Sequence, residues 1–137
     1  MTSNGYDIRV LPACSMEDHH AHLLRLDYLD RCLFFANGKD DHAVDAHCLR
    51  LLSSQAIVIG AYEQGRLRAS IEIIPDRGCK RAAATLIAEP DYQTDDLAQV
   101  MMKRANDEAR KHGLDRLDMV AMTGEPHTIR SQMARFG

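Results

Sequence analysis

Residues 85–114 read TLIAEPDYQTDDLAQVMMKRANDEARKHGL, and this stretch decides the fold. It begins with a short apolar strand at 85–88 and continues through a loop into a long amphipathic helix, which we expect to span 95–112. A strand that leads into the N-terminus of a helix is a ready-made anion site, because the free N–H groups and the helix dipole favour negative charge. Such loops usually carry glycines, and this one carries none. The corresponding residues are Thr94, Asp95, Asp96 and Ala98.

The predicted helix has a clear apolar face and a clear end. Gly113 and Leu114 match a glycine at the C′ position with its hydrophobic follower. The apolar residues recur at helical spacing along one stripe, which indicates the buried face. These residues are Leu97, Met101, Ala105 and Ala109.

Composition sets broad limits on the function. A chain of 137 residues suits a single domain, so we expect residues 1–137 to form one. The net charge of −3 is mild and has no basic block, which argues against a nucleic-acid-binding surface. We find no bilayer-spanning apolar run and no signal peptide, and the four scattered cysteines form no CxxC pair. We therefore expect a cytoplasmic protein with reduced thiols and no membrane partner.

The N-terminal third predicts one strand followed by helices. Residues 6–11 are a plausible strand, and Ser15 is a candidate N-cap with Asp18 three residues later. Residues 28–35 form a second short helix or a turn. After a loop, apolar residues at helical spacing predict a helix over 41–53.

The rest of the chain predicts a β-meander and two further elements. Strands at 56–62, 67–74 and 82–88 are separated by turn residues and pair as a three-stranded meander. After the long helix we expect a strand at 117–122 and a last short helix at 126–136.

This order of elements resembles that of the GNAT (GCN5-related N-acetyltransferase) acyltransferases. Glu89-Pro90-Asp91-Tyr92-Gln93 followed by Leu97 resembles the acetyl-CoA loop of that family, a Q/R-x-x-G-x-G/A pattern entering a helix. Residues 110–114 resemble the usual end of that helix, and residues 26–35 resemble a segment found in one GNAT branch. The resemblance covers residues 6–137. It implies a mixed α/β (α+β) fold with a mostly antiparallel central sheet and helices on both faces.

The resemblance also implies an activity and a site. The activity is acetyl transfer from acetyl-CoA to an amine of a small molecule or a protein lysine, without a metal. The pantetheine arm would lie along the backbone of Leu86, Ile87 and Ala88. The pyrophosphate would lie on Gln93, Thr94, Asp95, Asp96, Leu97 and Ala98. Glu89 is the first candidate for the base that deprotonates the amine, directly or through water, and Glu72 is the second. A solvent-facing salt bridge is the alternative for Glu89.

The loop departs from the family pattern in a way that weakens CoA binding. A carboxylate such as Asp96 about 5 Å from a phosphate charge costs roughly 3 kcal/mol at an effective dielectric of 20, and less where water screens it. Acids in the first turn also stabilise a helix, and Thr94 or Asp95 is a good N-cap. Two possibilities stay open: a weakened or lost CoA site, and a site retained through backbone contacts. A non-catalytic GNAT-fold module that binds a partner or itself is therefore the alternative function.

The C-terminus departs as well. GNAT domains continue after the last helix with two more strands, which we expect this chain to lack, whether its end is natural or truncated. The strand at 117–122 would then have an exposed edge, and a homodimer that covers it is a natural prediction. The Tyr that protonates the leaving thiolate in many members is also absent. His127 is a weak substitute, with a surface histidine as the alternative.

Two histidine-rich stretches, 18–22 and 41–48, offer a further alternative. Nitrogen, oxygen and sulfur ligands from two helices could hold zinc. No known zinc spacing is matched, and solvated helix faces explain the pattern, so we expect no metal. Cys79 stands beside Lys80, which could lower the pKa of the thiol, with an incidental loop cysteine as the alternative.

Overall fold

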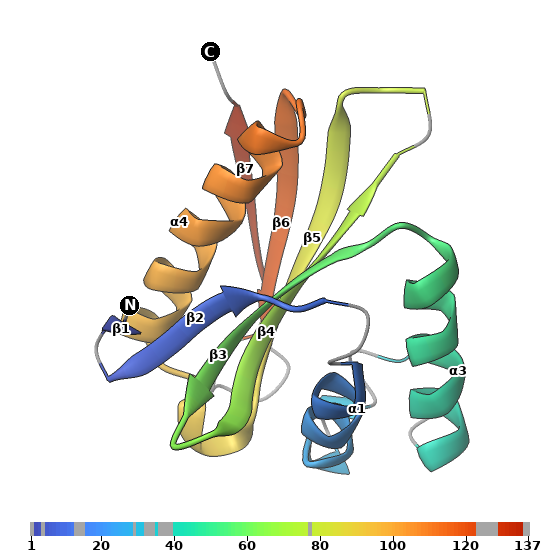
Figure 1. Cartoon of the computed structure of the whole chain (residues 1–137), viewed down its shortest axis with the longest axis vertical. Helices are drawn as coiled ribbons and strands as arrows, with labels where there is room; N and C mark the ends of the chain where they lie inside the picture. Colours follow the sequence, from blue (N-terminus) through green and yellow to red (C-terminus); the bar gives the residue numbers. More distant parts are fainter. Residues whose placement is uncertain are drawn as a thin grey trace.

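The computed structural model describes residues 2–3, 5–12, 16–28, 30–31, 35, 40–76, 78–122 and 129–135 (Figure 1). In chain order its elements are β1 (Thr2–Ser3), β2 (Tyr6–Val10), α1 (Met16–Leu24), α3 (Asp41–Ser53), β3 (Ile57–Glu63), β4 (Arg66–Pro75), β5 (Arg81–Ala88), the short 3-10 helix η2 (Pro90–Tyr92), α4 (Asp95–Lys111), β6 (Arg116–Met122) and β7 (Ile129–Arg135). The predicted strands up to β6 and the long helix agree with these bounds to within one residue at each end. The predicted N-cap Ser15 lies outside the described residues.

The described strands form one sheet in the order β1-β2-β3-β4-β5-β6-β7. Neighbouring strands are antiparallel except β5 and β6, which run parallel from the Arg81–Arg116 pair to the Leu86–Ala121 pair. Parallel neighbours need a crossover, and α4 provides it. Ile87 and Ala88 continue past the last β5–β6 pair while still pairing with β4. Within the described part of the chain, the C-terminal end of β5 is therefore paired on one side only.

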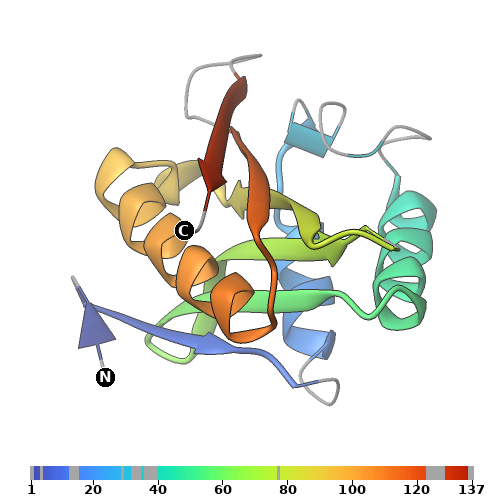
Figure 2. The same ribbon diagram turned by 90° about the horizontal axis from the view of Figure 1, so that it is seen from above.

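Helices cover both faces of the sheet, as predicted. Figure 2 shows α4 on one side and α1 and α3 on the other. The alternation of side chains along β5 assigns the two faces. Leu86 belongs to the main core cluster together with Met101 of α4, whereas Ile87 packs with Leu23 of α1 and Val44 of α3. None of the helices in the described ranges is long and apolar enough to cross a bilayer.

The long helix α4 has the buried stripe and the termini that the sequence predicts. The four stripe residues are all buried against the sheet. Thr94 is the N-cap, and its Oγ1 accepts a hydrogen bond from Leu97 N at 3.4 Å. At the other end Gly113 has a φ of +76°, and Leu114 N donates to Ala109 O at 3.1 Å. These are the features of a Schellman motif, which needs a residue that tolerates positive φ.

The prediction of a helix at 126–136 is wrong. Residues 129–135 form β7, which pairs antiparallel with β6 from Met122–Ile129 to Arg116–Arg135. The free edge of β6 offers a row of unpaired N–H and C=O groups, and pairing with them outweighs a weak local helix preference. One strand therefore follows β6 where we expected none. The homodimer prediction loses its original reason, because the edge that it was to cover is already paired.

Candidate functional site

Glu89 stands at the C-terminal end of β5 and is the centre of a buried polar cluster. Only 4% of the residue is exposed. Its Oε2 lies 2.9 Å from His22 Nδ1 and 3.0 Å from Arg25 Nε, and its Oε1 lies 2.8 Å from Arg68 Nη1. Glu89 therefore has salt-bridge partners, as the alternative interpretation expected, but it is buried rather than solvent-facing.

The electrostatics of this cluster keep Glu89 ionised. Burial raises the pKa of the Glu89 carboxyl, but the hydrogen bond from His22 and the two guanidinium groups outweigh burial and hold the pKa below its ordinary value. Burial lowers the pKa of His22, against a smaller opposing effect of Glu89. A neutral imidazole thus donates from Nδ1 to a carboxylate, which can only accept. Within the described part of the chain, the buried Nε2 of His22 has no hydrogen-bond partner.

A β-bulge in β4 places Arg68. Ala61 pairs with Ala69 and the next residue, Tyr62, pairs with Leu67, so Arg68 is the extra residue opposite β3. An extra residue interrupts the alternation of side chains along a strand and re-aims them. The bulge therefore allows Arg68 to reach the end of β5.

The carbonyl groups at the bulge fix the surroundings of Glu89. Leu67 O accepts a hydrogen bond from Arg25 Nη2 at 2.6 Å. Arg68 O accepts one from Glu89 N at 3.0 Å. The two arginines and the carboxylate are thus held by backbone as well as by one another.

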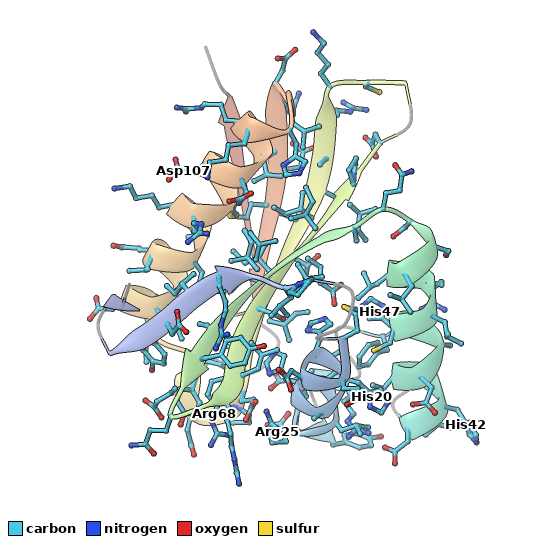
Figure 3. All side chains as sticks on the ribbon, in the orientation of Figure 1. His20, Arg25, His42, His47, Arg68 and Asp107 are labelled. Atoms are coloured by element: carbon cyan, nitrogen blue, oxygen red, sulfur yellow. The ribbon has the colours of Figure 1, made fainter. Side chains whose placement is uncertain are left out.

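An open depression of about 440 Å³ lies over this cluster. Figure 3 shows Arg25 and Arg68 at the same end of the molecule, where α1 ends and β4 begins. The Arg68 guanidinium lies 5.1 Å from the centre of the Tyr92 ring, a cation–π contact. The depression is lined by Arg25, Arg68, Glu89, Pro90, Asp91 and Tyr92.

The strand predicted to hold a pantetheine arm runs directly into this cluster. Leu86, Ile87 and Ala88 are all buried, so only their backbone could contact a ligand. Gln93 Nε2 donates to Ala88 O at 3.0 Å and to Asp30 Oδ2 at 2.9 Å. Gln93 therefore ties the loop to the end of β5, and one carbonyl of the predicted site already has a protein partner.

The N-terminus of α4, predicted to hold a pyrophosphate, is acidic and already capped. The N–H of Leu97 is bonded to the Thr94 side chain, and the N–H of Ala98 to Thr94 O at 3.1 Å. Asp95 and Asp96 are exposed in the first turn. A phosphate here would meet two carboxylates and two donors that are already used.

The second candidate base, Glu72, lies in a separate buried cluster on β4. Its carboxylate is 2.7 Å from His19 Nε2 of α1 and 2.8 Å from His47 Nε2 of α3, and only 2% of Glu72 is exposed. Burial raises the pKa of Glu72, but the two histidine hydrogen bonds outweigh burial and lower the pKa. Glu72 is thus a polar contact between the two helices and the sheet, and it does not line the depression.

The two histidine-rich stretches lie side by side. His20 of α1 contacts Asp45 of α3 at 2.6 Å on the surface. Among the described residues no group of three or more histidine, cysteine, aspartate or glutamate side chains is arranged to hold a metal ion. Cys79 is exposed in the turn before β5. The candidate acid His127 lies outside the described residues.

Sequence reasoning named Glu89 and Glu72 but missed their partners. His22, Arg25 and Arg68 come from 21 to 67 positions away along the chain. One signal was available for Glu72, since it is the lone carboxylate of the predicted strand at 67–74 and stands between Ile71 and Ile73. No comparable signal marks Arg68, because the bulge that places it leaves no trace in the strand pattern.

Comparison with known proteins identifies the fold. No protein-family model matches the chain, and no curated protein matches it in sequence. Solved structures do match. A GNAT family acetyltransferase from Brucella melitensis in complex with acetyl-CoA has a TM-score of 0.66 and 16% identity, over 98% of this chain and 90% of that one.

Two further structures give the same result. The GNAT domain of S. lividans PAT has a TM-score of 0.68 and 10% identity, over 88% of this chain and 74% of that one. The paia N-acetyltransferase from Thermoplasma acidophilum in complex with coenzyme A has a TM-score of 0.58 and 15% identity, over 93% and 83%. The chain has the fold of the GNAT acetyltransferases, which confirms the predicted fold class.

Proposed function

We propose that this chain is a GNAT-type acyltransferase that moves an acetyl group from acetyl-CoA to an amine, with a weakened site for the CoA pyrophosphate. The observation that carries the proposal is the C-terminal end of β5. There the backbone of Ile87 and Ala88 has no partner in β6 among the described residues, and the depression opens next to it at Glu89. The similarity in fold to proteins solved with acetyl-CoA or CoA supports the proposal.

The residues of the chain suit the two ends of acetyl-CoA unequally. The side of the β5 backbone that β6 leaves unpaired can offer hydrogen bonds to a pantetheine arm, except through Ala88 O, which already accepts one from Gln93. The first turn of α4 suits a pyrophosphate poorly, because Asp95 and Asp96 oppose it and the N–H groups of Leu97 and Ala98 are used. When bound, acetyl-CoA supplies the thioester carbonyl that an amine attacks and the thiolate that leaves.

The surroundings of Glu89 limit the role that it can have in acetyl transfer. A carboxylate offers about four lone-pair positions, and three are taken by His22, Arg25 and Arg68. With its pKa lowered, Glu89 is a weak base for direct proton abstraction. We assign to it the ordering of a water that takes the proton from the acceptor ammonium. His127 stays a candidate for the acid that protonates the thiolate.

Calorimetric titration with acetyl-CoA tests the weakened site. Asp96→Asn should tighten binding by up to about two orders of magnitude, since the repulsion removed is roughly 3 kcal/mol before screening. Asp107→Asn is the matched control, because Asp107 is an exposed aspartate of the same helix three turns further on (Figure 3). The electrostatic argument fails if the parent binds as tightly as Asp96→Asn.

The alternative function is a non-catalytic GNAT-fold module that binds a partner or itself. The observation that favours it is the capped, acidic start of α4. Absence of binding heat at millimolar acetyl-CoA in both the parent and Asp96→Asn, together with no release of CoA in the presence of amines, would establish this alternative over the enzyme.

A further inference from the structure

Two arginines at the depression have donors without a partner among the residues that the structure describes. Arg25 donates hydrogen bonds from Nε to Glu89 and from Nη2 to Leu67 O, and its Nη1 has no partner among the described residues. Arg68 donates a hydrogen bond from Nη1 to Glu89, and its Nη2 has no partner among the described residues either. The Arg25 and Arg68 side chains are 32% and 20% exposed, so a ligand in the depression can reach them.

We propose that this arginine pair binds a carboxylate, so that the acceptor is an amine that also carries a carboxylate, as an amino acid does. The carboxylate site is defined by the arginines themselves. Only the statement that its ligand accepts the acetyl group rests on the proposed function. Guanidinium groups bind carboxylates through paired, charge-assisted hydrogen bonds, which a lysine ammonium cannot reproduce.

The pair is held in place before any ligand arrives. Arg25 is bonded to Glu89 and to the Leu67 carbonyl, and Arg68 is bonded to Glu89 and packs against Tyr92. Side chains already fixed lose little conformational freedom on binding, which favours affinity. The two guanidinium groups share the single Glu89 carboxylate beside a neutral His22, and Glu63 is a further carboxylate near Arg68.

The rim of the depression decides which kind of anion fits. Asp91 lines it and is exposed, and Glu63 accepts a hydrogen bond from Tyr92 Oη at 2.8 Å. These carboxylates repel a doubly charged group such as a phosphate monoester and attract an ammonium. A zwitterion with one carboxylate and one ammonium matches both halves of the site, whereas an amine without a carboxylate matches only the rim.

The test is an NMR titration of the full chain with matched small molecules. The probes are ω-amino acids from glycine to 6-aminohexanoate, the alkylamines of the same lengths, and inorganic phosphate. We expect at least one amino acid to give saturable amide shifts at Arg68 and Glu89, and its affinity to exceed that of its matched alkylamine about tenfold or more. Tighter binding of phosphate, no saturable binding of any amino acid, or equal binding of the alkylamines would overturn the proposal.

Variants separate recognition from folding. Arg68→Gln should weaken binding of that amino acid about tenfold or more, while Arg81→Gln, in an exposed pair at the other end of β5, should leave binding unchanged. Arg68→Lys keeps a positive charge beside Glu89 but loses the paired N–H donors of the guanidinium group, so an intermediate affinity is expected. If Arg68→Gln does not fold, Arg25→Gln and Arg68→Lys carry the test, and undiminished binding in both refutes the proposal.

Acetyl transfer is measured separately as release of CoA. Transfer to alkylamines as fast as to amino acids refutes the carboxylate requirement and leaves the proposed function intact. Amino-acid binding that depends on Arg68 without any transfer refutes the proposed function and leaves the carboxylate site intact.

Discussion

Acid should destabilise this protein through His22. The imidazole is fully buried, with Nδ1 at 2.9 Å from Glu89, Arg25 nearby, and the His19 ring centre 5.8 Å away. Burial lowers the pKa of His22 below its ordinary 6.5. In the unfolded chain the same group takes up a proton near that ordinary value, so the unfolded state binds more protons as the pH falls below it.

The sign and the size of the effect follow from this difference. Stability is fully present above about pH 6.5 and falls as the pH drops toward the folded-state pKa. One proton contributes a slope of at most about 1.4 kcal/mol per pH unit. The pKa values of Glu72 and Glu89 are lowered below their ordinary 4.5, so their contributions are lost only at still lower pH. The interval from pH 6.5 to 5.5 therefore separates histidine titration from that of these two carboxylates, and comparison with His22→Gln isolates the share of His22.

Urea unfolding at pH 7.5, 6.5 and 5.5 measures this slope. We expect the parent to lose up to about 1 kcal/mol of unfolding free energy between pH 6.5 and 5.5 through His22, because the unfolded histidine is only half protonated at pH 6.5, and His22→Gln to lose correspondingly less. His20→Gln is the matched control, because His20 lies two positions away on the same helix and is paired with Asp45 on the surface. A slope in His22→Gln equal to that of the parent would show that the buried imidazole is not held neutral.

Three further predictions concern packing, the cap of α4 and the thiols. Met101→Ala should lower the unfolding free energy by about 2–5 kcal/mol in urea, since this fully buried side chain fills the α4 face of the core. Gly113→Ala should lower it by about 1–2 kcal/mol in the same assay, because its φ of +76° suits only glycine well. Peptide mapping after iodoacetamide treatment at pH 8 should show faster labelling of the exposed Cys79 than of Cys48, whose pKa is raised to about 11 by burial and by Glu72. Equal labelling rates would contradict the last prediction.

The α4 face of the fold could be predicted from the sequence because its rules are local. The stripe of α4 and the glycine at its end depend on spacings of four residues or fewer. The meander depends on turn residues between short β-branched runs. Each of these signals is contained in one element, so no knowledge of the tertiary structure was needed.

The α1 face could not be predicted in the same way. The histidine-rich part of α1, with Asp18, His19, His20 and His22, reads as a solvated helix face, yet two of these histidines are fully buried. What makes their burial possible is a carboxylate for each, Glu72 and Glu89, from strands that come much later in the chain. The error at β7 has a related origin, because the partner that makes residues 129–135 a strand is the edge of β6.

The polar contacts of α1 differ in what they contribute. Burying an ion pair seldom stabilises a protein more than apolar packing of the same volume, so stability alone does not explain why charges are kept here. The Glu72 cluster joins α1, α3 and β4 away from the depression, where registry of the helices is a sufficient role. The Glu89 cluster instead ends at an open surface, and it holds two arginines that line this surface and keep donors without a partner among the described residues. A side chain that serves only to dock α1 has no need of a second guanidinium from β4. The donors that this arginine leaves without a partner among the described residues are the physical reason for proposing recognition at the end of β5.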